Sequence, residues 1–369
     1  MSETETRVCD HCRHPHPVQN LTEFEEHSLC PFCLDELTVV CESCGQRIWR
    51  SDDAGDDHTH VCERCYGRFY TTCEDCGRII HINDAYLTDD DDYICDSCHE
   101  NRVSPRKIRD YYYKPAPIFY GSGNRHYGVE LEIDDAGEYN KNAGRILDVA
   151  NESREHLYIK HDGSLNDGME LVTHPMTLDY HMNTMPWEDV LDCAKELGYL
   201  SHRTNTCGLH IHVNRNSFGD SEEDQEECIA RILFFVEKFW DELLKFSRRN
   251  TRQMEKWAAR YGIKENPKDV LKHAKSSYGS SRYACVNLTN AATIEFRIFR
   301  GTLRYNTLVA TLQLVSRICD MASCLEDEDF QNMSWTSFVS SCWNLPELVQ
   351  YLKERTLYIN EPVATVEEI

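Results

Sequence analysis

Charged side chains alternate with apolar ones in three short stretches of this 369-residue chain. The stretches are HYGVELEID at 126–134, CGLHIHVNRN at 207–216 and ATIEFRIF at 292–299, and their polar positions are Glu130, Glu132, Asp134, His210, His212, Asn214, Glu295 and Arg297. Because successive side chains of a β-strand point to opposite faces, each stretch is predicted to be a strand with one apolar and one charged face. One such strand alone would be interpreted as a solvated face, but three together indicate a shared site.

These residue types suit metal and phosphate chemistry. Like charges at positions i and i+2 of a strand repel each other unless a cation lies between them. Glu130 and Glu132 therefore indicate a hard divalent ion, Mg²⁺ or Mn²⁺, which prefers oxygen ligands and bridges phosphates. His210 would add a ligand to Mn²⁺ or donate a hydrogen bond to a phosphate. The guanidinium groups of Arg297 and Arg300 have the fork geometry that suits phosphate or carboxylate.

Further elements must position these residues. A strand pair around a turn is predicted at 157–175, with Lys160 and Asp162 before the turn and Glu170 on the returning strand. Helical spacing of apolar residues predicts helices at 179–199, 221–249, 268–275, 305–324 and near 345–358. A half-buried sheet packed on helices follows, so the fold class is α+β. Four glycines are interpreted as turn or bulge positions: Gly163, Gly168, Gly208 and Gly301.

Twelve of the chain's 19 cysteines form CxxC pairs. The pairs are Cys9/Cys12, Cys30/Cys33, Cys41/Cys44, Cys62/Cys65, Cys73/Cys76 and Cys95/Cys98. Alternate pairs begin at residues 9, 41 and 73, a period of 32 residues that indicates a tandem repeat. Four thiolates satisfy one tetrahedral Zn²⁺. Three zinc-ribbon-like modules are therefore predicted, at about 9–33, 41–65 and 73–98, each with one structural zinc ion that supplies folding energy.

Spacing leaves the zinc ligand pairing open. Seven residues separate Cys33 from Cys41, and seven separate Cys65 from Cys73, so interleaved sites are an alternative. Nearby histidines are interpreted as loop residues rather than ligands: His27, His58, His60 and His81.

The charge balance bears on partners. The formal net charge is −24, and residues 1–110 hold 11 lysines and arginines against 24 aspartates and glutamates. Nucleic-acid binding needs a cationic surface, so this composition argues against a nucleic-acid partner. The cysteine repeat is interpreted as a module that binds a protein partner or docks a substrate, with a structural cap or spacer as the alternative.

Length suggests two or three domains. The predicted boundaries are the cysteine repeat at 1–103, a basic and aromatic linker at 104–120, a globular domain at 121–360 and a tail at 361–369. No signal-peptide apolar segment is visible at the N-terminus, and the longest dense apolar run, ILFFV at 232–236, is too short to span a bilayer. With zinc-type cysteine spacing, these features predict a soluble protein of the cytoplasm with no membrane partner.

Four ordered motifs resemble those of the amidoligase family, which is associated with the carboxylate–amine ligase fold of glutamine synthetase and glutamate–cysteine ligase. The motifs are YGVELEID, KHDGSLNDGMELVTHP, CGLHIHVN and IEFRIFRGTL. The resemblance covers roughly residues 120–320 and excludes the cysteine repeat. It implies an antiparallel sheet shaped into a funnel, with ATP at one end and metal ions held by strand glutamates. Many members come from bacteriophages and bacterial mobile elements, so a phage-like protein in the cytoplasm of a bacterial host is implied.

The resemblance also implies a reaction. A carboxylate would attack the γ-phosphate of ATP to form an acyl phosphate, and an amine would then displace phosphate to form an amide. Metal ions and arginines would neutralise the phosphoryl oxygens. Among the expected metal ligands, Glu130 and Glu132 would hold one metal set and Glu295 a second. Glu170 would lie at the metals or near the amine, and Asp162 would orient or deprotonate the amine. His210, or less favourably His212, would contact metal or phosphate, and Arg297 and Arg300 would contact phosphate and the acyl phosphate.

Two other hypotheses compete with an active ligase that uses its zinc modules as a substrate adaptor. The first is a zinc-ribbon interaction protein whose ligase-like domain has lost activity, against which the complete set of polar residues argues. The second is a metal-dependent hydrolase built on His210, His212 and the glutamates. A hydrolase would not need Glu295 and Arg297 together with the paired glutamates, and the sequence has no HExxH helix. The carboxylate and amine substrates stay open between small molecules, peptides, cell-wall components and proteins.

Overall fold

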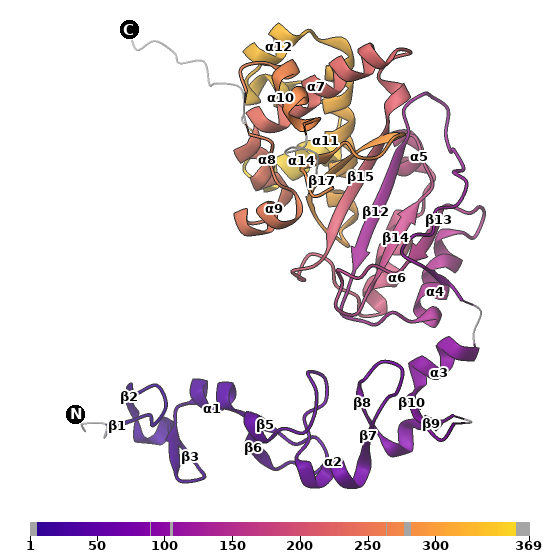
Figure 1. The fold of residues 1–369 in the computed structure, drawn as a ribbon. Helices are drawn as coiled ribbons and strands as arrows, with labels where there is room; N and C mark the ends of the chain where they lie inside the picture. The colour runs from indigo at the N-terminus through magenta and orange to yellow at the C-terminus, as the bar shows by residue number, and fades with distance from the viewer. Residues whose placement is uncertain (1–5, 89, 104–105, 263, 277–281, 359–369) are drawn as a thin grey trace. The chain divides into compact units, whose positions relative to one another are not determined.

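The computed structural model describes residues 6–88, 90–103, 106–262, 264–276 and 282–358. The chain divides into two compact units, Met1–Ser104 and Pro105–Ile369. The first unit holds the cysteine pairs, and the second holds the three alternating strands (Figure 1).

Three similar modules follow one another along the first unit. Each begins with a short antiparallel hairpin whose turn carries one CxxC pair, and each ends in a helix that begins at the second pair (Figure 1). The hairpins are β1 (Thr6–Val8) with β2 (Pro15–Pro17), β5 (Thr38–Val40) with β6 (Arg47–Trp49) and β7 (Tyr70–Thr72) with β8 (Ile79–His81). The helices are α1 (Pro31–Leu37), α2 (Glu63–Phe69) and α3 (Asp96–Val103).

The middle part of each module differs. The first and third modules have a second hairpin, β3 (Thr22–Phe24) with β4 (His27–Leu29) and β9 (Ala85–Leu87) with β10 (Tyr93–Cys95). In the second module a loop takes this place, and Asp53 accepts hydrogen bonds from the backbone N–H groups of Gly55 and Val61. The buried apolar residues of each module are mainly its cysteines, so hydrophobic burial supplies little folding energy there.

In the described part of the second unit, seven strands form one mixed sheet. Their order is β11 (Ile108–Arg109), β13 (Leu157–Lys160), β14 (Met169–Thr173), β12 (Tyr127–Ile133), β15 (Gly208–Asn214), β17 (Thr293–Arg300) and β16 (Val286–Asn287). Neighbouring strands are antiparallel except β11 and β13, which are parallel. The four central strands include the three alternating stretches of the sequence.

Strand β11 corrects the expectation of a purely antiparallel sheet, and it lies within the segment 104–120 that was predicted to be a linker. Ile108 pairs with Ile159 of β13 in the parallel sense. The side chain of Asn140 accepts hydrogen bonds from the backbone N–H groups of Lys107 and Ile108 and holds this segment on the second unit. A strand of two residues has no periodicity, so the sequence pattern contains no signal for it.

The apolar face of the sheet is fully packed. The alternating apolar residues of β12, β15 and β17 are at most 1% exposed: Val129, Leu131, Ile133, Leu209, Ile211, Val213, Ile294, Phe296 and Ile298. The pairing of β15 with β17 shifts by one residue, because Ile211 lies opposite Phe296 whereas Leu209 lies opposite Phe299. This β-bulge inserts one extra residue into β17 and changes which side chains follow it on each face.

Helices cover the apolar face and form a single core with it (Figure 1). The helices are α4 (Asn140–Ala150), α5 (Leu178–Asn183), α6 (Trp187–Glu196), α7 (Glu222–Lys238), α8 (Trp240–Ser247), α9 (Thr251–Trp257), α10 (Pro267–Ala274), α11 (Tyr305–Cys324), α12 (Asp327–Asn332), α13 (Trp335–Ser340) and α14 (Pro346–Glu354). Two expected helices are each divided. The segment 179–199 breaks before α6 at Pro186, which cannot continue a helix, and 221–249 breaks at Phe239.

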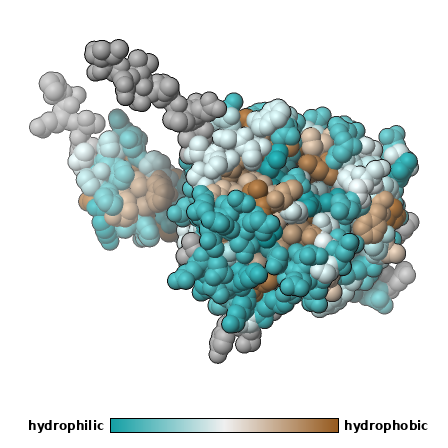
Figure 2. Space-filling model, turned by 90° about the horizontal axis from the view of Figure 1, so that it is seen from above, coloured by the Kyte–Doolittle hydropathy of each residue, from teal (hydrophilic) through white to brown (hydrophobic). Residues whose placement is uncertain are grey.

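No described helix is both long and apolar enough to cross a membrane. The face of the second unit in Figure 2 is mainly hydrophilic, and its apolar residues lie in small, separate patches. The longest described helix, α11, buries most of its apolar residues against α7 and α14.

Of the four glycines that were interpreted as turn or bulge positions, Gly163 lies in a turn, and the other three permit close approach of neighbouring groups. None of them has a positive φ angle. At Gly168 an added Cβ would lie 2.0 Å from the carbonyl oxygen of Ile133. At Gly208 it would lie 2.7 Å from the Arg249 side chain, and at Gly301 it would lie 2.2 Å from the Ser201 side chain. Glycine at these three positions therefore permits close approach, whereas an added Cβ at Gly163 would come no closer than 3.8 Å to a neighbour.

We expect Gly168→Ala to destabilise the second unit by about 1–3 kcal/mol, because its Cβ would meet the backbone of Ile133 and Asp134 rather than a flexible side chain. The matched control is Gly144→Ala in α4, where nothing lies within 4 Å. This control should raise stability by about 0.5–1 kcal/mol, since alanine favours a helix. Denaturant unfolding followed by tryptophan fluorescence measures both, and equal stabilities of the two variants would contradict the packing argument.

Candidate active site

The polar faces of the central strands meet in one row across the sheet. Residues directly opposite each other are Lys160 and Glu170, Glu170 and Glu132, Glu130 and His210, His212 and Glu295, and Glu295 and Asn287. Opposite residues of an antiparallel pair project to the same face. Strand register therefore brings together six of the expected site residues, Glu130, Glu132, Glu170, His210, His212 and Glu295.

Three of these side chains converge on one point. Oε1 of Glu130 lies 3.2 Å from Nε2 of His212, and Oε1 of Glu295 lies 4.0 Å from the same nitrogen. This nitrogen is buried, and it contacts Glu130 as an ion pair but forms no well-directed hydrogen bond with a described residue. Buried polar atoms are normally satisfied, so an imidazole nitrogen that faces two carboxylates fits the ligand set of a divalent ion.

A second group shares Glu130 with the first and adds Glu170 and His210. In each group the donor atoms lie within 4.8 Å of one another, a spacing that one ion can bridge. His210 Nδ1 lies 3.5 Å from Oε2 of Glu130 and 3.7 Å from Oε1 of Glu295. Carboxylate oxygens with one imidazole per group suit Mg²⁺ or Mn²⁺, so the residues present fit the expected metals.

The imidazoles hold two of the glutamates ionised. Burial opposes ionisation of Glu130, but His212 and His210 outweigh it and hold the pKa of Glu130 well below its ordinary value. Burial likewise raises the pKa of Glu295, but His212, His210 and Arg297 bring it below the ordinary value. In return, the charge of Glu130 overcomes burial and raises the pKa of His212.

The other two glutamates of this row resist ionisation. Burial and the charge of Glu130 raise the pKa of Glu170 well above its ordinary value, although Nζ of Lys160 lies 2.9 Å from its Oε2. Burial also raises the pKa of Glu132, against the charge of His210. Carboxylates this close together cannot all be ionised in a low-dielectric site without added positive charge. Bound divalent ions would supply that charge.

The two expected arginines lie in different surroundings. Arg297 forms an ion pair with Glu295, and its Nε is buried without a hydrogen-bond partner among the described residues. Arg300 lies opposite Gly208, on the polar face, because the bulge in β17 reverses the alternation after Arg297. Its Nη2 donates to the carbonyl oxygen of Thr204, and it lines a cavity beyond the carboxylate row.

Asp162 lies in the turn between β13 and β14 rather than in the row itself. Its Oδ1 accepts a hydrogen bond from the backbone N–H of Ser164. Burial is the main cause of the raised pKa of Glu132, and the negative charge of Asp162 adds to it. The charge of His210 acts in the opposite direction.

Sequence patterns assigned no role to three further residues at the site. Lys160 forms the ion pair with Glu170, and Nδ2 of Asn287 donates to Oε2 of Glu295 at 2.8 Å. Arg249 is 8% exposed and donates from Nε to the Phe299 carbonyl oxygen. Lys160 had a detectable signal, since it shares the strand face that precedes Glu170 in the predicted pair. Arg249 had none, because it follows a helix and reaches the site only through tertiary packing.

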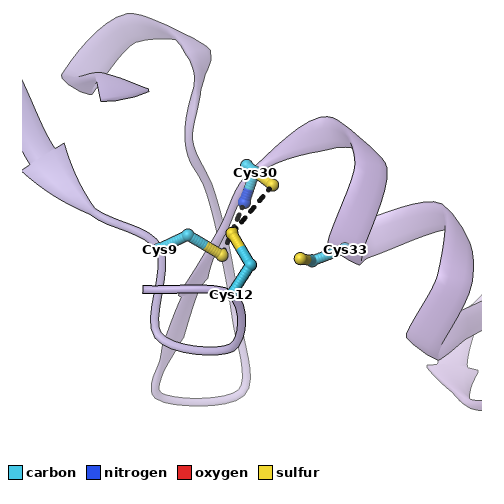
Figure 3. Close-up of side chains that lie close together, drawn as sticks. All are labelled: Cys9, Cys12, Cys30 and Cys33. Atoms are coloured by element: carbon cyan, nitrogen blue, oxygen red, sulfur yellow. Dashed lines mark hydrogen bonds between the residues drawn. The ribbon is translucent and has the colours of Figure 1, made fainter. Parts of the chain in front are cut away.

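The twelve paired cysteines form three clusters of four, one in each module. Figure 3 shows Cys9 and Cys12 in a turn, with Cys30 and Cys33 directed toward them from the start of α1. All sulfurs of a cluster lie within 4.8 Å of one another, and Cys12 Sγ lies 3.9 Å from Cys30 Sγ. Sulfurs bound tetrahedrally to Zn²⁺ at about 2.3 Å would be about 3.8 Å apart, so the clusters fit zinc. Each cluster pairs cysteines of a single module, not of neighbouring modules.

The first cysteine of every module is prepared for ionisation. Burial raises the pKa of Cys9, but backbone N–H groups, first that of Cys30, lower it to about 6. The same arrangement lowers the pKa of Cys41 to about 6 and that of Cys73 to about 7. Thiolates are the form that binds metal, so hydrogen bonds from the local backbone favour metal binding.

One segment of the chain matches a family model. Residues 146–319 match the model described as "Putative amidoligase enzyme". This segment, just under half of the chain, is similar to the amidoligase family. The matched segment contains most of the candidate site, Asp162, Glu170, His210, His212, Glu295, Arg297 and Arg300, whereas strand β12 with its two glutamates precedes it. No curated protein matches the sequence.

Two solved structures resemble the chain over part of its length. The crystal structure of a bifunctional glutathione synthetase from Pasteurella multocida is 13% identical, with a TM-score of 0.34, over 63% of this chain and 46% of that chain. The crystal structure of the complex between the prokaryotic ubiquitin-like protein Pup and its ligase PafA is 8% identical, with a TM-score of 0.28, over 63% of this chain and 58% of that chain. This chain therefore spans only about half of the length of each of these two proteins.

We expect the purified protein to contain one zinc ion for each of the three cysteine clusters, measured by elemental mass spectrometry. Cys41→Ser should lower the content by one ion and unfold the second module, because the module has little other core. Cys324→Ser changes an exposed cysteine of α11 outside the clusters and should leave the zinc content unchanged. An unchanged metal content in Cys41→Ser would contradict the assignment of this cluster.

Proposed function

We propose that the second unit is an ATP-dependent carboxylate–amine ligase that forms an amide bond through an acyl phosphate. The observation that carries this proposal is the row of four glutamates and two histidines on adjacent strands of a domain that is similar to the amidoligase family. Its two ligand groups share Glu130, as expected for a site that places two divalent ions beside transferring phosphoryl oxygens. The funnel shape that the resemblance implies stays a prediction.

The residues of the chain would divide the work as follows. Glu130, Glu295 and His212 would hold one divalent ion, and Glu130, Glu170 and His210 would hold a second. Bound there, the ions would neutralise charge on the γ-phosphate of ATP. Arg297 would contact the phosphoryl oxygens, since its Nε is buried and lacks a partner among the described residues.

The bond changes balance without a further reactant. A substrate carboxylate oxygen attacks the γ-phosphorus, the bond to the bridging oxygen breaks, and ADP leaves. The amine nitrogen then attacks the acyl carbon, phosphate leaves with the bonding electrons, and the amine loses one proton. Asp162, in the turn beside Glu132, is the proposed group that orients the amine or accepts this proton.

Lys160 and Asn287 would position the glutamates rather than react. The ammonium group of Lys160 fixes Oε2 of Glu170, and the amide of Asn287 fixes Oε2 of Glu295. Oε1 of Glu295 then faces the two histidines and also forms the ion pair with Arg297. Fixing ligand oxygens in this way raises metal affinity because the ligands need not reorganise on binding.

The three cysteine modules would act as an adaptor that holds a protein partner or a peptide substrate. Their acidic composition, 24 aspartates and glutamates against 11 lysines and arginines over residues 1–110, suits a basic partner. Each thiolate cluster with zinc bound adds further negative charge.

Calorimetric titration with ATP and Mg²⁺ tests the ligase site without knowledge of its substrates. We expect magnesium-dependent ATP binding that weakens by at least about 10-fold in the Glu130→Gln/Glu132→Gln variant, because two carboxylates are lost beside the phosphates. The matched control is Glu255→Gln, an exposed glutamate of α9 that should bind as wild type does.

No binding by the folded wild-type protein would contradict an active ligase. If binding is found, ADP release is then measured with mixtures of acids and amines. Release that requires an amine supports the ligase, whereas release or phosphate formation that is independent of any amine favours a metal-dependent hydrolase.

A further inference from the structure

A cationic cavity adjoins the carboxylate row at the end of β17. Its volume is about 520 Å³, within the range of small-molecule pockets. The lining side chains are His202, Asp241, Leu244, Lys245, Arg248, Arg249, Asn250, Arg300 and Arg355. Five cations thus face one carboxylate, in a chain whose overall charge is −24.

Neutral groups, not carboxylates, satisfy these cations. Among the described residues, Arg248 donates to the Gly301 carbonyl, Arg249 to Phe299, Arg300 to Thr204 and Arg248, Arg355 to Lys245, and Lys245 to Thr356. None of the five has a carboxylate oxygen of a described residue within 4.0 Å, in contrast to nearby Arg304, which forms an ion pair with Glu354. The positive charge of the cavity therefore exceeds the negative charge of the carboxylates around it.

Two of the arginines that line this cavity also carry a buried nitrogen without a partner. Nε of Arg248 and Nε of Arg300 are buried, and neither has a hydrogen-bond partner in the described part of the chain. A buried donor without a partner is unfavourable, so such donors indicate an absent acceptor. Burial and the charges of Arg248 and Arg300 also lower the pKa of His202 to about 4, which keeps it neutral and able to donate or accept.

The cavity and the carboxylate row meet at Gly208. A Cβ at this position would lie 2.7 Å from Nη2 of Arg249, 2.7 Å from Nε2 of His210 and 3.3 Å from Oε2 of Glu132. Arg249 therefore lines the cavity while it approaches the row. Burial lowers its pKa to about 10, although the charge of Glu132 opposes this shift. A ligand in the cavity could thus extend to the reacting centre.

We infer that this cavity binds a doubly charged oxyanion, a phosphate or a pair of carboxylates, carried by the acid substrate at a distance from its reacting carboxylate. This inference rests on the proposed function, because it names the class of acid that the ligase would use. The fork geometry of four guanidinium groups suits planar and tetrahedral oxyanions, and a cation-rich cavity next to carboxylates excludes cationic ligands. No metal ion is needed for this binding, since the cavity supplies the positive charge.

The test is calorimetric titration of the full-length, zinc-loaded protein with glutarate and with inorganic pyrophosphate, without added divalent cation and at low ionic strength. We expect both to bind, and Arg248→Gln or Lys245→Gln to weaken each by about 10-fold. Arg304→Gln removes the same kind of charge outside the cavity and should change affinity by less than about twofold. Thermal unfolding of every variant establishes that it is folded.

Three outcomes would overturn the inference. The first is that the folded wild type binds neither probe. The second is that Arg304→Gln and Arg248→Gln lose affinity for the probes equally. The third is that ADP binds without metal more than about 10-fold more tightly than pyrophosphate does. The last would assign the cavity to a nucleotide, since adenosine would then be recognised as well. Magnesium-dependent ATP binding lost in Glu130→Gln/Glu132→Gln reports on the ligase site separately, so either proposal can fail while the other stands.

Discussion

Burial of like charges on one strand face is the constraint on which the second unit depends. The apolar face of β12 and β15 must pack on helices, so their alternating polar residues are directed together onto the opposite face. Register then places Glu130 beside two histidines and Glu132 beside Glu170. The pKa values of the four glutamates move in opposite directions as a result, and only added cations would let all four ionise.

Around this site, Lys160 and Arg297 form ion pairs within the carboxylate row, but the five cations of the neighbouring cavity form none with the row. The carboxylate row lies on one side of Gly208, and the arginine-lined cavity lies on the other. Pairing them internally would neutralise both, as Arg304 and Glu354 do at the surface. Keeping them apart leaves one region that attracts cations and one that attracts anions, which suits a reaction that brings metal ions, phosphate and a carboxylate together.

The two units are stabilised by different physical means. In the second unit, one continuous core joins the sheet to its helices, so its fold does not need a ligand. In the first unit, each module buries its cysteines with few other apolar side chains. Bound metal would replace the missing hydrophobic core there, because the four sulfurs of each module already lie close enough together to bind one ion.

The amino-acid sequence by itself determined two features of this protein, the alternating strands of the candidate site and the 32-residue repeat of cysteine pairs. Both are visible in the sequence because each pattern depends on residues that are near one another in the chain. Only tertiary structure decided the rest. The parallel strand β11 has no periodicity, the bulge in β17 moves Arg300 to the polar face, and Arg249 reaches Glu132 from the end of a helix. Each of these depends on pairing or packing between segments far apart in sequence, which no local pattern encodes.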